Sequence, residues 1–228
     1  MLFRQLFENE SSTYTYLIAK EYGCDAVLID PVKKNTSQYI QLIKQLELTL
    51  IAVMETHLHA DHISAMGELC KHFDCESVMG QKSGAKGISI PIQGDALLEF
   101  GGLTFKALYT PGHTNDSYCY LMEDRVFTGD TLLIRGTGRT DFQGGSAAQQ
   151  YDSLFQKLLC LPKDTLVYPA HDYNGMTVST IGEEIRFNPR LQVTSKEDYI
   201  ALMDNLKLSP PKMMEIAIPA NKNGGIEP

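Results

Sequence analysis

The sequence predicts an α/β or α+β fold, because segments with strand periodicity and segments with helical periodicity occur in both halves of the chain. The 228 residues are 43% hydrophobic, which is enough to bury the core of one large domain. We find no internal repeat, low-complexity segment or linker that would divide the chain. We therefore expect one domain over residues 1–228, with a short helical or irregular extension after about residue 175.

Several segments have the alternation or the short apolar runs that are typical of strands. Residues 13–19 and 26–29 flank a turn at Tyr22-Gly23 and predict a β-hairpin. Residues 48–54 form an apolar run that predicts a buried strand. The other predicted strands are 103–109, 117–122, 125–128 and 165–168. Residues 80–102 are rich in glycine and lack helical periodicity.

Helical spacing of apolar residues indicates a helix that begins after Asn35, a suitable N-cap, and continues to Glu47. Further helices are predicted around 63–73, 151–159, 181–187 and 196–206. The segment from Ser209 onward is rich in proline and glycine, and we expect it to be irregular.

Composition excludes several classes of protein. The formal charge is −8 and no run of Lys or Arg occurs, which argues against binding to nucleic acid or to an anionic membrane. The N-terminus lacks the pattern of a secretory signal, and the longest apolar run, residues 48–54, is too short to span a bilayer. Five cysteines without Cys-x-x-Cys spacing predict free thiols in a reducing compartment. We expect a cytoplasmic protein.

Three of the six histidines fall within the run HLHADH at residues 57–62, between the predicted strand 48–54 and the predicted helix 63–73. In an extended loop His57 and His59 point the same way and can reach one point, while Asp61 and His62 can reach a second point nearby. Imidazole and carboxylate are the ligands that zinc, iron and manganese take. The run predicts a metal site, and a polar loop with capping residues is the simpler alternative.

Three more residues of the same kinds follow the ends of predicted strands: His113, Asp130 and His171. Loops at one end of a sheet commonly display catalytic groups. Each residue alone could be a turn cap or a core histidine, but together with the HLHADH run they predict one site. His72 lies on a predicted helix without such a companion, and we expect it on the surface.

The order H-x-H-x-D-H, then His, Asp and His, with these flanking residues, closely resembles the metallo-β-lactamase superfamily over nearly the whole chain. The resemblance implies a four-layer αββα sandwich of two β-sheets flanked by helices, with metal at the sheet edges. The stretches FRQLFENESSTYTYLIA, FTGDTLLIRGTGRTDFQGG, YPAHDYNGMTVSTIGEE and NPRL are similar to the persulfide dioxygenase branch. Members of that branch oxidise glutathione persulfide with O2 to sulfite and glutathione.

This resemblance implies a single Fe(II) held by His57, His113 and Asp130. Two histidines and one carboxylate leave open positions on iron for O2 and a sulfur substrate. The other ligand-type residues would then orient the ligands and the substrate; they are His59, Asp61, His62 and His171. The alternative is a pair of zinc or iron ions that share all these residues, with Asp130 as a bridge, as in a hydrolase.

Glutathione carries two carboxylates, for which arginine is a natural partner. By resemblance, Tyr173 and Arg190 are candidates for binding glutathione, and Arg139 is a candidate for buttressing the metal loop. Simpler roles compete with these. Arg139 could pair only with Asp141, and Arg190 could cap the end of a helix.

We therefore predict a persulfide dioxygenase with one Fe(II), whose partners are glutathione persulfide and O2. The main alternative is a hydroxyacylglutathione hydrolase of glyoxalase II type with two metal ions. That family usually carries a longer C-terminal helical domain than this chain has after His171. A third hypothesis is a metal-binding protein without catalytic activity. Similar proteins suggest a homodimer.

Overall fold

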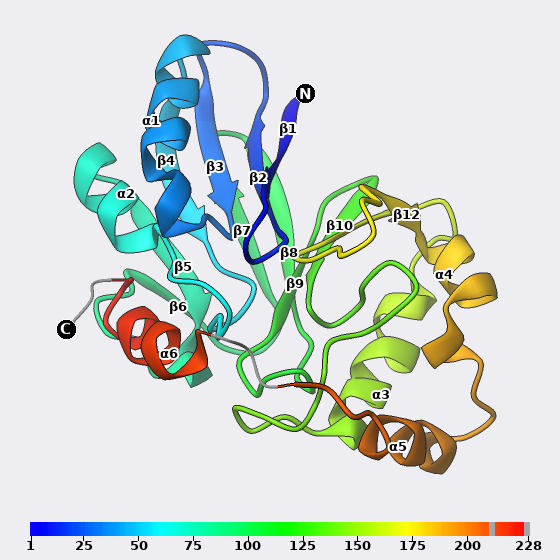
Figure 1. Cartoon of the computed structure of the whole chain (residues 1–228). Coiled ribbons are helices and arrows are strands. Elements are labelled where there is room, and N and C mark those ends of the chain that lie inside the picture. The colour runs from blue at the N-terminus through cyan, green and yellow to red at the C-terminus, as the bar shows by residue number, and fades with distance from the viewer. Residues whose placement is uncertain (210–212, 226–228) are drawn as a thin grey trace. The chain divides into compact units, whose positions relative to one another are not determined.

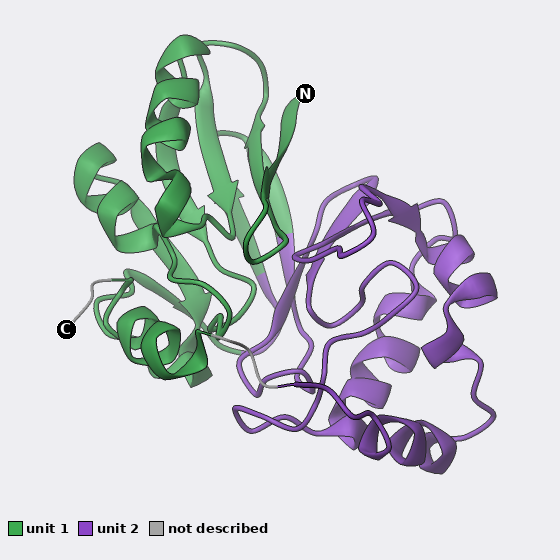
Figure 2. Ribbon diagram, viewed as in Figure 1, with its two compact units in different colours: residues 1–93, 97–105, 210–228 green, residues 94–96, 106–209 purple. Residues whose placement is uncertain are grey.

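Two six-stranded sheets organise the chain, which divides into two units (Figures 1 and 2). The structure is a computed structural model that describes residues 1–209 and 213–225. Unit 1 comprises residues 1–93, 97–105 and 210–228, and unit 2 comprises residues 94–96 and 106–209. The single domain over residues 1–228 stays a prediction.

The sheet of unit 1 has the strand order β1-β2-β3-β4-β5-β6. The first three strands, β1 (Leu2–Glu8), β2 (Thr13–Ala19) and β3 (Asp25–Ile29), pair antiparallel, which confirms the predicted hairpin. The next three, β4 (Thr49–Met54), β5 (Glu76–Gly80) and β6 (Ile90–Ile92), continue the sheet in parallel. In this sheet the sequence analysis missed β1, β5 and β6, because β1 carries polar residues without clean alternation and β5 and β6 are short.

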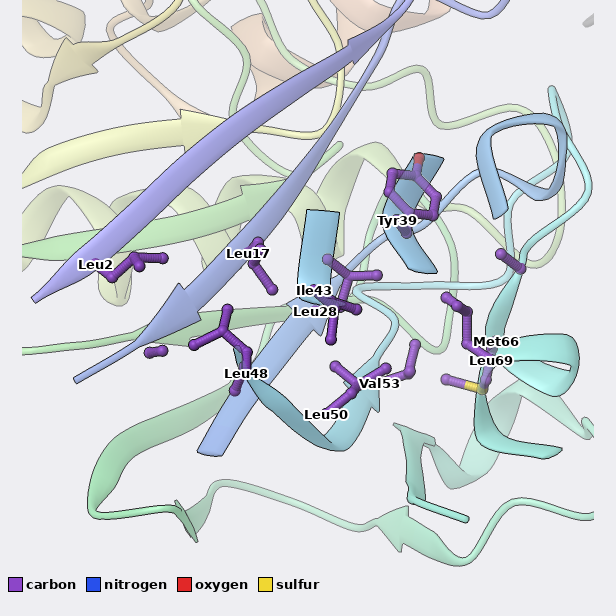
Figure 3. Close-up of a cluster of buried hydrophobic side chains, with 13 residues drawn as sticks. Leu2, Leu17, Leu28, Tyr39, Ile43, Leu48, Leu50, Val53, Met66 and Leu69 are labelled. Carbon is purple, nitrogen blue, oxygen red and sulfur yellow. The ribbon is translucent and has the colours of Figure 1, made fainter. Parts of the chain in front are cut away.

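The core of unit 1 lies between this sheet and the helices α1 (Thr36–Gln45) and α2 (Met66–Phe73) (Figure 3). The spacing of Tyr39 and Ile43 places both on the buried face of α1. The Tyr39 hydroxyl lies 2.9 Å from Thr15 Oγ1 and accepts a hydrogen bond from the Val32 N–H at 3.1 Å. Asn35 occupies the predicted N-cap position, but its side chain makes no capping hydrogen bond.

The second sheet has the order β12-β11-β10-β9-β8-β7. Its strands are β7 (Ala96–Phe100), β8 (Leu103–Tyr109), β9 (Tyr118–Leu121), β10 (Arg125–Gly129), β11 (Leu166–Pro169) and β12 (Ser179–Thr180). β8, β9 and β10 pair antiparallel, and β10 and β11 pair in parallel. The carboxyl ends of β10 and β11 therefore point the same way, which places the loops after them together.

Helices α3 (Ala147–Gln156), α4 (Ile181–Phe187) and α5 (Lys196–Asp204) cover the core of unit 2, close to the predicted ranges. The 3-10 helices are Lys33–Asn35, Gln81–Ser83, Leu158–Cys160 and Pro189–Leu191. The structure differs from our expectation of an irregular end, because residues Met214–Lys222 form helix α6 in unit 1 despite Pro219. All five cysteines are described and free. Among the described residues, no helix is long and apolar enough to cross a membrane.

Candidate metal centre

The HLHADH run forms the loop that connects β4 to α2 in unit 1, as predicted. Its three histidine side chains are almost fully buried, and their rings follow one another: the His57 and His59 centroids lie 4.2 Å apart and the His59 and His62 centroids 4.3 Å apart. His59, Asp61 and His62 have ligand atoms close enough together to hold a metal ion. Unit 1 therefore brings together all four of its predicted site residues.

A hydrogen-bond chain that starts at Asp30 orients His57. Asp30 directly follows β3, and its Oδ1 and Oδ2 accept hydrogen bonds from the Thr56 N–H at 2.7 Å and from the Thr56 hydroxyl at 2.8 Å. Because the hydroxyl proton is directed at Asp30, Thr56 Oγ1 accepts from His57 Nδ1, 3.0 Å away. The proton on Nδ1 leaves the lone pair of His57 on Nε2, the state that a metal ligand requires.

His59 is held by two buried carboxylates instead. Its Nε2 lies 3.2 Å from Asp30 Oδ1 and 3.1 Å from Glu55 Oε2, so Nε2 carries a proton. Burial opposes the charged imidazolium, but the carboxylates of Asp30 and Glu55 raise the pKa of His59 well above its ordinary value. Burial raises the pKa of Glu55. For Asp30 the interactions with His59 and Thr56 outweigh burial and lower the pKa.

Unit 2 brings together the other three predicted site residues, His113, Asp130 and His171. Asp130 follows β10 and His171 follows β11, and the parallel pairing of these strands aligns their ends. His113 Nε2 lies 3.6 Å from Asp130 Oδ2, and His171 Nε2 lies 3.8 Å from Asp130 Oδ1. These separations exceed hydrogen-bonding distance and are close to the roughly 3–3.5 Å between atoms that share one metal ion at about 2.1 Å.

Two glycines allow the loops of unit 2 to pack this closely. A Cβ at Gly112, whose φ is +145°, would lie 2.3 Å from Gln150 Cα at the start of α3. A Cβ at Gly138 would lie 2.2 Å from the Asp130 carbonyl oxygen and 2.8 Å from the His113 ring. The stretch IRGTGR therefore contributes a backbone without side-chain bulk next to Asp130 and His113.

The candidates for substrate binding lie in unit 2 with different surroundings. The Tyr173 ring is 71% exposed and stacks on His171, with centroids 6.1 Å apart. Arg190 is half-buried, its guanidinium donates to the carbonyl and the hydroxyl of Thr137, and no carboxylate among the described residues pairs with it. Burial lowers the pKa of Arg190.

Arg139 is already paired. Its guanidinium binds both carboxylate oxygens of Asp141, at 2.6 and 2.7 Å, and lies 3.9 Å from the centroid of the Phe142 ring. Its backbone carbonyl is the part that contacts the metal-type residues, because it accepts a hydrogen bond from His113 Nδ1 at 2.7 Å. The exposed side chain of His72, on α2, agrees with the predicted surface role.

The sequence analysis missed Asp30, Glu55, Thr56 and Asn221. Asp30 had a usable signal, since it is an acidic residue between the apolar strand 26–29 and Pro31. Glu55 and Thr56 immediately precede the histidine run, and their polar side chains are of the kind that can accept a hydrogen bond from a histidine ring. Nothing local marks Asn221, which lies far along the chain from the loop it contacts.

Comparison with known proteins agrees with this arrangement. The model of the metallo-beta-lactamase superfamily matches residues 9–89 and 83–171. The mitochondrial persulfide dioxygenase ETHE1 of Mus musculus is 45% identical over 230 residues, covering 100% of this chain and 90% of that protein. A probable hydroxyacylglutathione hydrolase of Schizosaccharomyces pombe is 33% identical, covering 85% of this chain and 91% of that protein.

The crystal structure of ETHE1 from Myxococcus xanthus superimposes with a TM-score of 0.96 at 51% identity, covering 99% of this chain and 100% of that one. This agreement confirms the fold that the sequence resemblance implied, with two mixed sheets and flanking helices. The chain belongs to the metallo-beta-lactamase superfamily and, within it, to the branch of the persulfide dioxygenases.

Proposed function

We propose that this protein is a persulfide dioxygenase that converts glutathione persulfide, O2 and water to glutathione, sulfite and two protons. The observation that carries the proposal is the 51% identity to ETHE1 of Myxococcus xanthus over 99% of the chain. The more distant likeness to a probable hydrolase, at 33% identity, makes thioester hydrolysis the function that an experiment has to exclude.

A single Fe(II) held by His57, His113 and Asp130 is the cofactor of this proposal. The residues fit an iron ion, because Nδ1 of both histidines donates to oxygen and leaves the lone pair on Nε2. Asp130 Oδ1 is a buried carboxylate oxygen without a hydrogen-bond partner among the described residues. Such an atom is costly unless a cation or water satisfies it. Bound iron would supply the activation of O2.

The protein's own residues would hold the ligands and the substrate in place. Asp30 and Thr56 fix the ring of His57, and the carbonyl of Arg139 fixes the ring of His113. This is also how Arg139 would buttress the metal loop, since its guanidinium is bound to Asp141. The remaining ligand-type residues would orient water and substrate near the iron; they are His59, Asp61, His62 and His171.

Glutathione would bind through Arg190 and Tyr173. The half-buried Arg190 guanidinium has no carboxylate partner among the described residues, so a carboxylate of glutathione would complete its hydrogen bonds. The exposed ring of Tyr173, stacked on His171, would offer a hydroxyl and an apolar face next to the metal-type residues.

The experiment combines metal analysis with an oxygen electrode. Purified protein with about one iron per chain should take up O2 when glutathione persulfide is added and form sulfite in equal amount. Hydrolysis of a glutathione thioester by protein with two metal ions per chain, without O2 uptake, would move the assignment to the hydrolase. His59, Asp61, His62 and His171 would then be metal ligands.

A further inference from the structure

The side chain of Asn221, near the end of helix α6, is buried against the HLHADH loop of unit 1. Its Nδ2 donates two hydrogen bonds, to the carbonyl oxygens of His59 and His62, both at 2.9 Å. Its Oδ1 accepts a hydrogen bond from the Ser64 N–H at 2.9 Å. One amide thus uses both of its protons and its oxygen to join three points of a loop far away in the sequence.

The loop depends on such a partner, because it has little secondary structure to satisfy its own backbone. Residues 55–63 belong to no helix or strand, and Ser64 forms only an isolated bridge with Val32. The carbonyls of His59 and His62 are the acceptors that Asn221 satisfies, in a segment whose histidines are almost fully buried. A buried carbonyl that loses its donor is destabilised, so the backbone would shift to find another partner.

The position of Asn221 is itself fixed by the chain that follows it. Gly225, with a φ of +80°, passes so close to the loop that a Cβ there would lie 2.3 Å from the Ser64 carbonyl oxygen. The Gly224 carbonyl accepts a hydrogen bond from the Gly67 N–H at 3.0 Å, at the start of α2. Lys33 Nζ donates to the Gly225 carbonyl at 3.3 Å. These contacts hold the end of α6 against Lys33, the end of the loop and the start of α2.

Asn221 also lies next to the residues that orient the histidines. It lines a small cavity of unit 1 together with Glu55, His57, His59 and Ser64. The Ser64 hydroxyl donates to Glu55, whose other oxygen lies 3.1 Å from His59 Nε2. Asn221 thus holds the backbone of His59, while Ser64 and Glu55 hold its side chain.

We propose that Asn221 is a positioning residue of the metal centre, which sets the backbone of residues 59–64 and thereby the positions of His59 and His62 beside His57. The inference rests on the proposed function only in taking these histidines to surround a metal ion. It makes the C-terminal helix α6 part of the metal centre's framework, although α6 contributes no ligand-type side chain to it.

The test measures metal affinity in the full-length protein without turnover. Fe(II) and Co(II) are titrated anaerobically into the metal-free wild type, Asn221→Ala and Asn221→Asp, and the visible spectrum of bound Co(II) reports ligand geometry. Asn221→Asp keeps the size of the side chain and its acceptor but loses both donors. We expect the dissociation constant to rise about tenfold to a hundredfold in both variants, with an altered Co(II) spectrum.

Two control variants separate positioning from general stability. Asn223→Ala removes an exposed asparagine two residues further along and should bind metal like the wild type. Ile43→Val removes one methylene group from the core of the same unit without removing a hydrogen bond of the loop, and should also leave metal affinity unchanged. Unchanged affinity and spectrum in Asn221→Asp would overturn the inference, as would an equal loss of affinity in Ile43→Val.

Failure of the proposed function is recognised separately. Weaker metal binding in the Asn221 variants supports the inference whether or not the wild type consumes O2. Absence of O2 uptake by the metal-loaded wild type overturns only the proposed dioxygenase activity.

Discussion

His113 donates a hydrogen bond from Nδ1 to the carbonyl oxygen of Arg139, over 2.7 Å. A carbonyl oxygen can only accept, so this contact fixes the tautomer and leaves the lone pair on Nε2, which faces Asp130 at 3.6 Å. The glycine next to Arg139 makes this possible, because Gly138 lies against both the His113 ring and the Asp130 backbone. The orientation of His113 therefore depends on Arg139 and Gly138 as well as on the identity of the histidine itself.

Gly138→Ala should weaken metal binding. The added Cβ would lie 2.2 Å from the Asp130 carbonyl oxygen, a backbone atom that cannot rotate away, and 2.8 Å from the His113 ring. We expect at least a roughly tenfold loss of metal affinity, measured by anaerobic titration. Gly136→Ala is the matched control, since its Cβ would meet only Leu133 Cβ at 3.8 Å. Equal affinities in the two variants would contradict this account of the loop.

His57→Ala should abolish iron binding and O2 uptake, because it removes one of the three proposed ligands. The measurement is iron content per chain after anaerobic loading, followed by the oxygen electrode. His72→Ala, which changes an exposed histidine on α2, should leave both quantities unchanged. Full iron occupancy in His57→Ala would show that His57 is not a ligand.

Arg190→Ala should raise KM for glutathione persulfide much more than it lowers kcat, since it removes binding energy that is shared by substrate and transition state. Arg190→Lys should recover part of the loss by keeping the charge without the planar fork. Arg186→Ala, on the exposed face of α4, serves as the control. An unchanged KM in Arg190→Ala would leave Arg190 with a structural role at Thr137 only.

Glu184→Ala should destabilise unit 2 far more than Glu183→Ala, although both carboxylates pair with Arg135. Glu184 is fully buried, and it also accepts hydrogen bonds from Ser179 Oγ at 2.5 Å and Asn188 Nδ2 at 2.9 Å. Its loss would leave several buried donors unsatisfied. We expect the free energy of unfolding, measured with urea, to fall by about 3 kcal/mol. The side chain of Glu183 is 41% exposed, so its removal should cost about 0.5–1 kcal/mol. Similar values for the two variants would refute this distinction.

Glu8→Gln should flatten the acid limb of the stability curve. Burial by itself raises the pKa of Glu8, but the N–H groups of Ser11 and Glu10, the Ser11 hydroxyl and Lys34 outweigh it and lower the pKa below its ordinary 4.5. Because the folded-state pKa is depressed, the ionised carboxylate stabilises the fold above about pH 4.5, and this contribution is lost as pH falls through the folded pKa. Wild type and Glu8→Gln should therefore differ in melting temperature at pH 7 and converge at low pH. A difference that does not change with pH would rule out this linkage.

Much of the fold was predictable from local pattern. The apolar spacing of residues 36–45 and 181–187 places α1 and α4, and the apolar run before the histidines places β4. Strands β1, β5, β6, β7 and β12 and helix α6 were not predicted, because their sequences are short or lack clean periodicity. The strands are stabilised by pairing with their neighbours in the sheets, and α6 by its contacts within unit 1.

The sequence alone determined the set of ligand-type residues and the branch of the superfamily, since both depend on residue identity and order. Only the tertiary structure decided which nitrogen of His57 and of His113 carries the proton. Folding brings Asp30 to Thr56, which then accepts from His57, and brings the Arg139 carbonyl to His113. It also decided that Asn221 holds the HLHADH loop from near the far end of the chain. Periodicity describes neighbours along the chain, whereas these hydrogen bonds join residues that only the packing of sheets and helices brings together.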